Sequence, residues 1–373
     1  PVGWNPKRGP FSDTVLAINF VADAGRLMLE SSTSVSEVED RLHRFLPVVG
    51  LDGCALEGTL NSLTLSYWQP GQAMPITTMR NVRVAAPRLE RLAGADRLLD
   101  QVENGTLDLE EAVSRLRDLQ DAPFPSQRTT RGAILLSVFG WLIFVDGLDL
   151  VTVVVALLAT ILTFPIDALV RRLHFPALGA TFLVATVVAA IPNLLAAAGV
   201  SLLVGPAVVG ALFIHLPGRA FVSSVIDGLA NSPLSSISRG IEAVATAGFL
   251  ALGMLVGNKI GTGFGLSYTP DVTATPIPQS LIGSGLGVLG LAVAWAMPRR
   301  QIAPAVAISA MGWLIVALFT EGLASQADWL GYAVAAGVVG MAGAAAASLQ
   351  HSTASVYTGV AILPLVPGFT LYT

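Results

Sequence analysis

The chain has 373 residues, of which 53% are hydrophobic and only 12% are charged, and its mean hydropathy is +0.68. Soluble globular domains carry about 25% charged residues, so this composition excludes an ordinary soluble enzyme and predicts a membrane protein. The formal net charge of −4 argues against nucleic acid as a partner. The single cysteine, Cys54, excludes an intrachain disulfide framework.

The charged residues divide the chain into two parts. Residues 1–127 hold 12 Lys/Arg and 17 Asp/Glu, whereas residues 128–373 hold 9 and 8. The first part therefore has the composition of a soluble domain, and the second has that of a bilayer domain. Two prolines within residues 121–127 end a helix and predict a short stiff linker. Because the sequence lacks an initiator Met and stops abruptly, we expect a fragment of a longer protein.

The first part reads as an α+β domain. Ser34 and Glu37 form a predicted capping box, in which the serine oxygen accepts a backbone N–H and the glutamate reaches back. His43 is expected on a solvated helix face and Cys54 in a buried strand, so no catalytic residue is predicted here. The expected elements are helices at 12–30, after the capping box, at 87–102 and at 108–120, and strands at 53–59 and 62–68.

A helix that spans a bilayer needs about 20 mostly apolar residues. Eight arginines fall in the loops on one side of the predicted helices, and Lys259 is the single basic residue in the loops on the other side. Because positive charge collects in cytoplasmic loops, the N-terminal domain is predicted to be cytoplasmic. Nine candidate spans are found, at 129–145, 148–170, 177–197, 199–215, 237–257, 280–297, 302–320, 327–349 and 355–371.

Two similar breaks suggest an internal repeat. The fourth helix ends in His215-Leu-Pro-Gly218, and the ninth contains Leu363-Pro-Leu-Val-Pro-Gly368. Since five helices per half is an odd number, the second half must be inverted relative to the first, as in many secondary transporters. We expect repeats at 128–257 and 280–373, with a tenth helix beyond the given chain. The alternative is that Pro-Gly merely kinks two unrelated helices.

The sequence around these breaks resembles the threonine/serine exporter family of bacterial (ThrE-like) amino-acid exporters. The resemblance rests on "SSTSVSEVEDRLHRFLPVVGL", "LERLAGADRLLDQVENGTLDLEEAVSRLRDL", "LPGRAFVSSVIDGLANSPLSSISRGIEAV" and "GVAILPLVPGFTLY". It implies a cytoplasmic domain before ten helices in the bacterial plasma membrane. It also implies export of L-threonine and L-serine driven by protons, without a cofactor. A homo-oligomer is left open.

Polar groups at membrane depth are costly and are usually functional. Asp167 and Glu242 are the candidates for proton coupling, although each has an alternative role as an ion-pair partner, of Arg171 and of Arg239 respectively. The polar run before the second break could instead be the start of a helix. The candidate substrate-binding residues are Asn193, His215, Pro217, Gly218, Ser355, Tyr357, Pro364, Pro367 and Gly368.

Other patterns in the sequence carry no such function. Gly285, Gly287 and Gly290 spell a dinucleotide fingerprint but lie in an apolar helix, so we expect them, with Gly337 and Gly340, to pack helices together. The four scattered histidines predict no metal site. Two other functions stay open, namely a membrane-embedded enzyme with a catalytic N-terminal domain and a small-solute channel.

Overall fold

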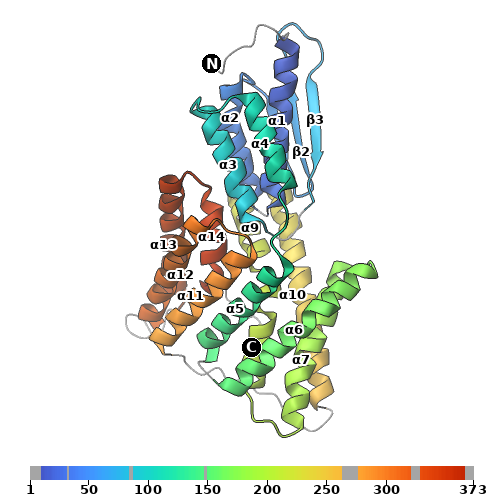
Figure 1. Ribbon diagram of the computed structural model, residues 1–373, viewed down its shortest axis with the longest axis vertical. Coiled ribbons are helices and arrows are strands. Elements are labelled where there is room, and N and C mark those ends of the chain that lie inside the picture. The colour runs from blue at the N-terminus through green and yellow to red at the C-terminus, as the bar shows by residue number, and fades with distance from the viewer. Residues whose placement is uncertain are drawn as a thin grey trace.

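The computed structural model describes residues 10–31, 33–83, 87–146, 149–262, 276–320 and 328–365. The charged N-terminal part and the apolar helices are stacked along the longest axis of the molecule (Figure 1). Pro123 and Pro125 lie between the last helix of the first part and the first helix of the second. The breakpoint in composition therefore coincides with a physical boundary between two groups of elements.

The described residues of the N-terminal part form four helices and a small antiparallel sheet. Leu63 and Leu65 are fully buried on one face of the middle strand and pack toward the first helix, as strand alternation requires. The third strand was not predicted from the sequence. The elements are α1 (Pro10–Glu30), α2 (Val35–Phe45), a 3₁₀ turn (Leu46–Val49), β1 (Ala55–Gly58), β2 (Ser62–Tyr67), β3 (Ile76–Asn81), α3 (Leu89–Glu103) and α4 (Leu109–Asp121).

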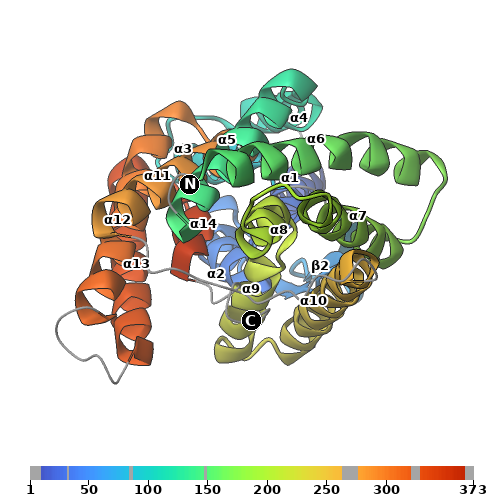
Figure 2. The same ribbon diagram turned by 90° about the horizontal axis from the view of Figure 1, so that it is seen from below.

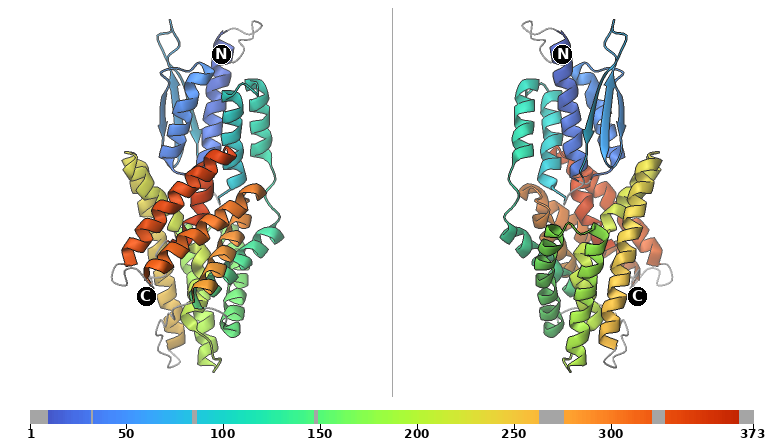
Figure 3. Two further views of the ribbon diagram at one scale, coloured as in Figure 1. Left: turned by 90° about the vertical axis from the view of Figure 1, so that its left-hand side faces the viewer. Right: turned by 90° about the vertical axis from the view of Figure 1, so that its right-hand side faces the viewer.

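Helix α1 is the centre of this domain. It contacts β2 and β3 on one side and α3 and α4 on the other, and Figure 3 shows the sheet and the α3–α4 pair on opposite sides of the helical layer. Cys54 is buried and reduced, and His43 is exposed, as the sequence predicts. Burial of the thiol raises the pKa of Cys54, which disfavours a reactive thiolate.

The second part is built of apolar helices. Within its described ranges, six are long and apolar enough to cross a membrane, namely α6, α7, α10, α11, α12 and α13, and α8 with α9 forms a pair bent by 51°. The elements are α5 (Gln127–Asp146), α6 (Leu150–Arg172), α7 (Ala177–Ala197), α8 (Val204–Leu212), a 3₁₀ turn (Phe213–His215), α9 (Gly218–Leu229), α10 (Pro233–Thr262), α11 (Ile277–Ala294), α12 (Arg299–Leu318), α13 (Asp328–Gln350), α14 (Ala354–Ala361) and a 3₁₀ turn (Leu363–Leu365).

The prediction for the fourth span was wrong. The sequence predicted one helix over 199–215, closed by Pro217 and Gly218 and followed by a loop that contains Asp227. Instead, Pro217 is the N-cap of a new helix, α9, and Asp227 lies within that helix. The proline lacks an N–H group and so interrupts the hydrogen-bond ladder, after which the chain turns and continues as a helix.

The most intimate contact between apolar helices is that of α5 with α11. Gly140, Gly283 and Gly290 allow the two backbones to meet, because a Cβ atom at any of them would fall on backbone atoms of the other helix. The hydroxyl of Ser137 donates to the carbonyl of Gly287 at 2.9 Å. Glycine therefore packs these helices together, as the sequence predicts for Gly287 and Gly290.

A second glycine seam joins α10 to α7. Gly253, Gly257 and Gly261, spaced by four residues, lie against the backbone and side chains of α7. By contrast, a Cβ atom added at Gly337 or Gly340 would meet no atom of the described residues within 4 Å, so the prediction that they pack helices was wrong. Seen from below, α11–α14 gather on one side, whereas α6, α7 and α10 gather on the other (Figure 2).

The α5–α11 seam generates a stability prediction. Gly140→Ala places a methyl group against the α11 backbone, which cannot yield as a side chain can. We expect a loss of about 1–3 kcal/mol in unfolding free energy, read as a lower melting temperature of the detergent-purified protein. Gly132→Ala on the same helix is the matched control, because its Cβ would meet no described atom within 4 Å. Equal melting temperatures for the two variants would refute the seam.

Candidate functional site

The N-terminus of α2 is capped as predicted, but only by half of the capping box. The hydroxyl oxygen of Ser34 accepts a hydrogen bond from the Glu37 backbone N–H at 3.3 Å. The carboxylate of Glu37 points toward the apolar helices, where it accepts hydrogen bonds from the hydroxyls of Thr33 at 2.7 Å and of Ser355. The acid that the sequence assigns to local capping thus contacts the other part of the molecule.

Glu37 contacts the first turn of α14. Besides the hydroxyl contact, the backbone N–H of Ser355 donates to Oε1 of Glu37 at 3.3 Å, and among the described residues the N-cap Thr353 makes no side-chain hydrogen bond to this turn. A carboxylate at a helix N-terminus satisfies free N–H groups and interacts favourably with the helix dipole. Glu37 therefore acts as a cap for α14 from another domain.

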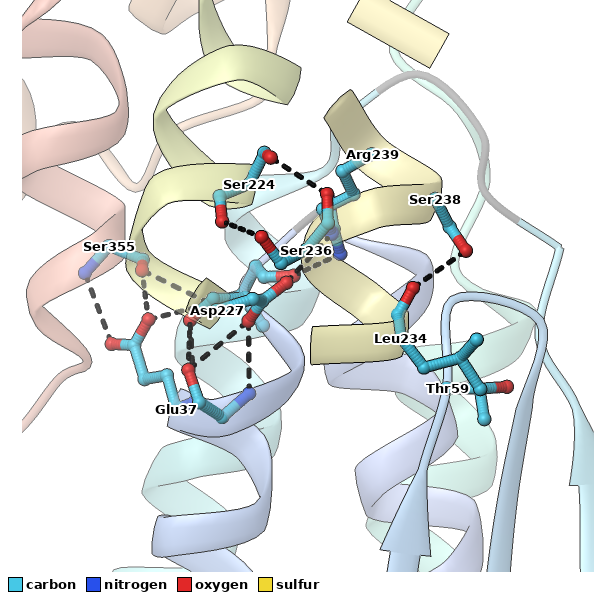
Figure 4. Close-up of polar contacts among 12 residues, drawn as sticks. Glu37, Thr59, Ser224, Asp227, Leu234, Ser236, Ser238, Arg239 and Ser355 are labelled. Carbon is cyan, nitrogen blue, oxygen red and sulfur yellow. Dashed lines mark hydrogen bonds and ion pairs between the residues drawn. The ribbon is translucent and has the colours of Figure 1, made fainter. Parts of the chain in front are cut away.

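A buried ion pair lies beside this contact (Figure 4). Oδ2 of Asp227 on α9 is 3.2 Å from Nε of Arg239 on α10, and the two residues are 0% and 4% exposed. Both the backbone N–H and the hydroxyl of Ser36 donate to Oδ1 of Asp227 at 3.2 Å. Nη2 of Arg239 in turn donates to the carbonyl of Thr33 at 2.7 Å. The pair is thus completed by the tip of α2.

We call Glu37, Asp227, Arg239 and Ser355 the polar junction. Its α9 and α10 arms are held together by two reciprocal hydrogen bonds, in which the hydroxyls of Ser224 and Ser236 donate to each other's carbonyls at 2.7 and 2.8 Å. The polar junction joins the soluble part to α9–α10, from the first predicted repeat, and to α14, from the second.

The first turn of α9 also approaches the second predicted repeat. The guanidinium carbon of Arg219 lies 4.7 Å from the ring centre of Trp295, at the end of α11. A Cβ added at Gly359 of α14 would be 3.8 Å from that carbon. The carbonyl of Trp295 accepts a hydrogen bond from the Leu89 N–H of the soluble part at 2.9 Å. The break in the fourth span is therefore close to α14, as a central site requires.

The other predicted site residues of the first repeat form two separate groups. Asp167 acts electrostatically on His215, whose Nδ1 is buried without a hydrogen-bond partner among the described residues. Asn193 donates to the Ala189 carbonyl at 2.8 Å and to Oδ1 of Asn258 at 2.9 Å. The structure does not bring Asn193 into the polar junction.

The two alternatives for the acidic candidates have different outcomes. Arg239 pairs with Asp227, and Glu242 is exposed and interacts with Arg239 only at the level of long-range charge. The side chain of Arg171, the expected partner of Asp167, lies outside the described residues.

In the second repeat, the described residues reach Leu365. Thr353 is an N-cap and Ser355 lies in the first turn of α14, so the polar run is the start of a helix. Tyr357 is fully buried beside Gln301, and Pro364 is buried in the closing 3₁₀ turn. Pro367 and Gly368 lie outside the described residues, so the second break is seen only up to its first proline.

Two carboxylates near the domain boundary are perturbed. Burial raises the pKa of Glu39, which accepts a hydrogen bond from the Gly58 N–H at 2.6 Å and lies near Asp227. Burial and the neighbouring Asp96 raise the pKa of Asp100. In the described part of the chain, no three His, Cys, Asp or Glu side chains are grouped as a metal site requires.

The sequence analysis missed the main members of the polar junction. It treated Asp227 as a loop residue and Glu37 as a local cap, and it gave Ser36 no role. An amphipathic pattern over 218–229, with Asp227 on the side away from the exposed Phe221 and Val225, could have indicated a helix with one buried face.

Comparison with known proteins adds the family. A family model described as "Putative threonine/serine exporter" matches residues 19–261, and a second, "Threonine/Serine exporter, ThrE", matches residues 280–373. A "Probable threonine/serine exporter" of Mycobacterium tuberculosis is 24% identical over 93% of this chain and 67% of its own length. A "Threonine/serine exporter" of Corynebacterium glutamicum is 23% identical over 95% and 74%. No solved structure matches the chain significantly.

The contact of Glu37 with α14 predicts a measurable change in backbone protection. Glu37→Gln removes the negative charge at the helix N-terminus, worth roughly 1 kcal/mol. We expect amide hydrogen exchange over residues 353–361 to become about fivefold faster by mass spectrometry. Glu57→Gln, on the exposed face of β1, should leave it unchanged. Unchanged exchange in Glu37→Gln would contradict this role.

The buried ion pair predicts a larger effect on stability. Asp227→Asn leaves Arg239 without its counter-ion, which costs about 3–5 kcal/mol, measured as thermal unfolding of the detergent-purified protein. The double variant Asp227→Asn/Arg239→Gln should recover part of this loss, and Glu242→Gln, at an exposed neighbour of Arg239, should change stability by less than about 1 kcal/mol. If Asp227→Asn unfolds at the wild-type temperature, Asp227 and Arg239 contribute nothing as a pair.

Proposed function

Because the chain belongs to the threonine/serine exporter family, we propose that it exports L-threonine and L-serine from the cytoplasm in exchange for protons. The observation that carries the proposal is the broken span α8–α9, bent by 51° at Pro217, whose second arm contacts α14. Discontinuous helices of this kind bind substrates in secondary transporters, because their termini expose free backbone groups at membrane depth.

An inverted repeat is the proposed framework for this site. Its support is that equivalent contacts recur in both halves. The second helix packs against the fourth in each, as α6–α8 and as α12–α14, and the first helices α5 and α11 pack against each other. In each half the fourth helix passes into a 3₁₀ turn at the break, at Phe213–His215 and at Leu363–Leu365.

A zwitterionic hydroxy amino acid requires partners for three groups. We assign its carboxylate to the N-terminus of α9, where Gly218 and Arg219 follow the break, since a half-helix N-terminus favours an anion. Carbonyls freed by Pro217 and Pro364 are the proposed acceptors for the ammonium group. Tyr357, buried in α14, is the proposed partner of the hydroxyl group. His215 and Ser355 flank these groups, and Pro367, Gly368 and Asn193 stay predictions.

The bacterial plasma membrane with an inward-facing N-terminal domain is the proposed location. The soluble part contacts the end of the helix bundle that carries Arg219, Arg239 and Trp295, the last of which precedes Arg299 and Arg300 by a few residues. Loops rich in arginine are retained on the cytoplasmic side. For proton coupling we assign Asp167, next to His215, together with Glu242.

Two other classes of protein are less well supported. An enzyme would need a nucleophile, a base and an acid within reach of one another, and the described part of the N-terminal domain places its His43 on an exposed face, apart from the buried Cys54. A channel would be expected to carry rings of charge or a repeated filter. Export through two related halves accounts for both breaks, so we favour a transporter over an enzyme.

Gly218→Leu tests the proposed site. The leucine fills the space in which the backbone approaches the substrate, so we expect threonine efflux from proteoliposomes to be abolished while the protein inserts and melts as the wild type does. Efflux is measured with labelled threonine, with and without a proton gradient. Gly248→Leu on α10 is the matched control, because its Cβ would meet no described atom within 4 Å, and it should export normally.

A stable Gly218→Leu variant that exports at a near wild-type rate would place the site elsewhere and make the break a structural kink. Wild-type export that is indifferent to the proton gradient would reject the coupling but not the substrate.

A further inference from the structure

A cleft of about 670 Å³ opens between the soluble part and the second predicted repeat. One wall comes from α3 and the other from the start of α12 and the end of α13. Its size suits a small ligand. The proposed mechanism gives this cleft no role, although it lies at the end of the bundle that we assign to the cytoplasm.

The cleft carries both signs of charge. Arg97, Arg299, Arg300 and His351 line it with exposed side chains, and Asp100 lines it from α3. Cationic and anionic groups facing one small space are complementary to a ligand that carries both charges.

The start of α12 favours a carboxylate. The N-cap of this 20-residue helix is Pro298, which makes no side-chain hydrogen bond to the first turn. Arg299 and Arg300 follow directly, so two positive charges lie at the positive end of the helix dipole, an unfavourable arrangement. A carboxylate bound there would satisfy backbone N–H groups and both guanidinium groups.

Gln301 supplies the second, independent observation. It lines the cleft and is 4% exposed, and its Oε1 has no hydrogen-bond partner in the part of the chain that the structure describes. A buried acceptor without a donor costs free energy, and an ammonium group is a suitable donor. On its inner side Gln301 lies beside the buried Tyr357, which we assign to the substrate site.

We propose that this cleft captures the zwitterionic amino acid from the cytoplasm before transport. Arg299, Arg300 and the N-terminus of α12 hold its carboxylate, and Gln301 and Asp100 receive its ammonium group. Gln301 then connects the cleft to Tyr357 at the α12–α14 contact. The inference rests on the proposed function and gives the soluble domain a role, because α3 contributes one wall of the entry site.

Two variants in the full-length protein test the capture site by kinetics. Arg300→Gln removes a charge that holds the carboxylate, and Gln301→Leu removes the buried acceptor at similar volume. In inside-out vesicles we expect each to raise the KM for threonine at least about tenfold with little change in maximal rate, as loss of ground-state binding requires. Arg172→Gln, at an exposed arginine on the same side of the bundle but outside the cleft, is the matched control and should leave KM unchanged.

A binding measurement separates this inference from the proposed function. Equilibrium dialysis of the detergent-purified protein with labelled L-threonine should show binding that Arg300→Gln weakens and Arg172→Gln does not. If wild type binds threonine in this way but exports neither amino acid, the capture site stands and the proposed function fails. If wild type exports threonine while KM and binding are unchanged in both cleft variants, the arginines serve only membrane orientation and the capture site is overturned. Absence of threonine binding to wild type overturns it as well.

Discussion

The buried carboxylate of Asp227 ties the two parts of this protein together. A carboxylate at 0% exposure is tolerated only when charge and hydrogen bonds compensate for the lost water. Here the guanidinium of Arg239 supplies the charge, and the backbone and hydroxyl of Ser36 supply the hydrogen bonds. Because Ser36 belongs to the soluble part, these hydrogen bonds reach the broken span only with that part docked. The soluble domain is therefore a structural component of the helix bundle.

Much of the soluble domain follows from local signals. The apolar stripe of α1, the serine cap of α2 and the paired leucines of β2 each predict their element within a few residues, because burial on one face imposes the period. The third strand was missed, since the β3 sequence Ile76–Asn81 is mostly polar and its pattern is half-exposed throughout. Its position is set by pairing with β2, a tertiary interaction that a local pattern does not encode.

The candidate site was predicted in outline, and the reason for its incompleteness is physical. Pro217 and Gly218 were identified because proline and glycine act on the backbone at their own positions. Glu37 and Asp227 were not, because their partners are 318 and 191 residues away. A search for unbroken apolar segments also favours spans over helices such as α9, which has one apolar and one polar face. Arg219, Arg239 and Gln301 were hidden for the same reason.

The two kinds of contact between the halves differ in how they can move. At the α5–α11 seam, glycines bring backbone against backbone, and Ser137 hydrogen-bonds a main-chain carbonyl across it. Close-packed interfaces of this type are discrete and resist gradual sliding. The polar junction, by contrast, is made of hydrogen bonds and an ion pair, groups that can exchange partners with water or with a substrate at little net cost once the site opens. If export proceeds by relative motion of the halves, the α5–α11 seam is the axis, and the polar junction and the adjoining cleft are where the bundle opens. The soluble domain, which contacts both arms of the junction, is then placed to bias that opening.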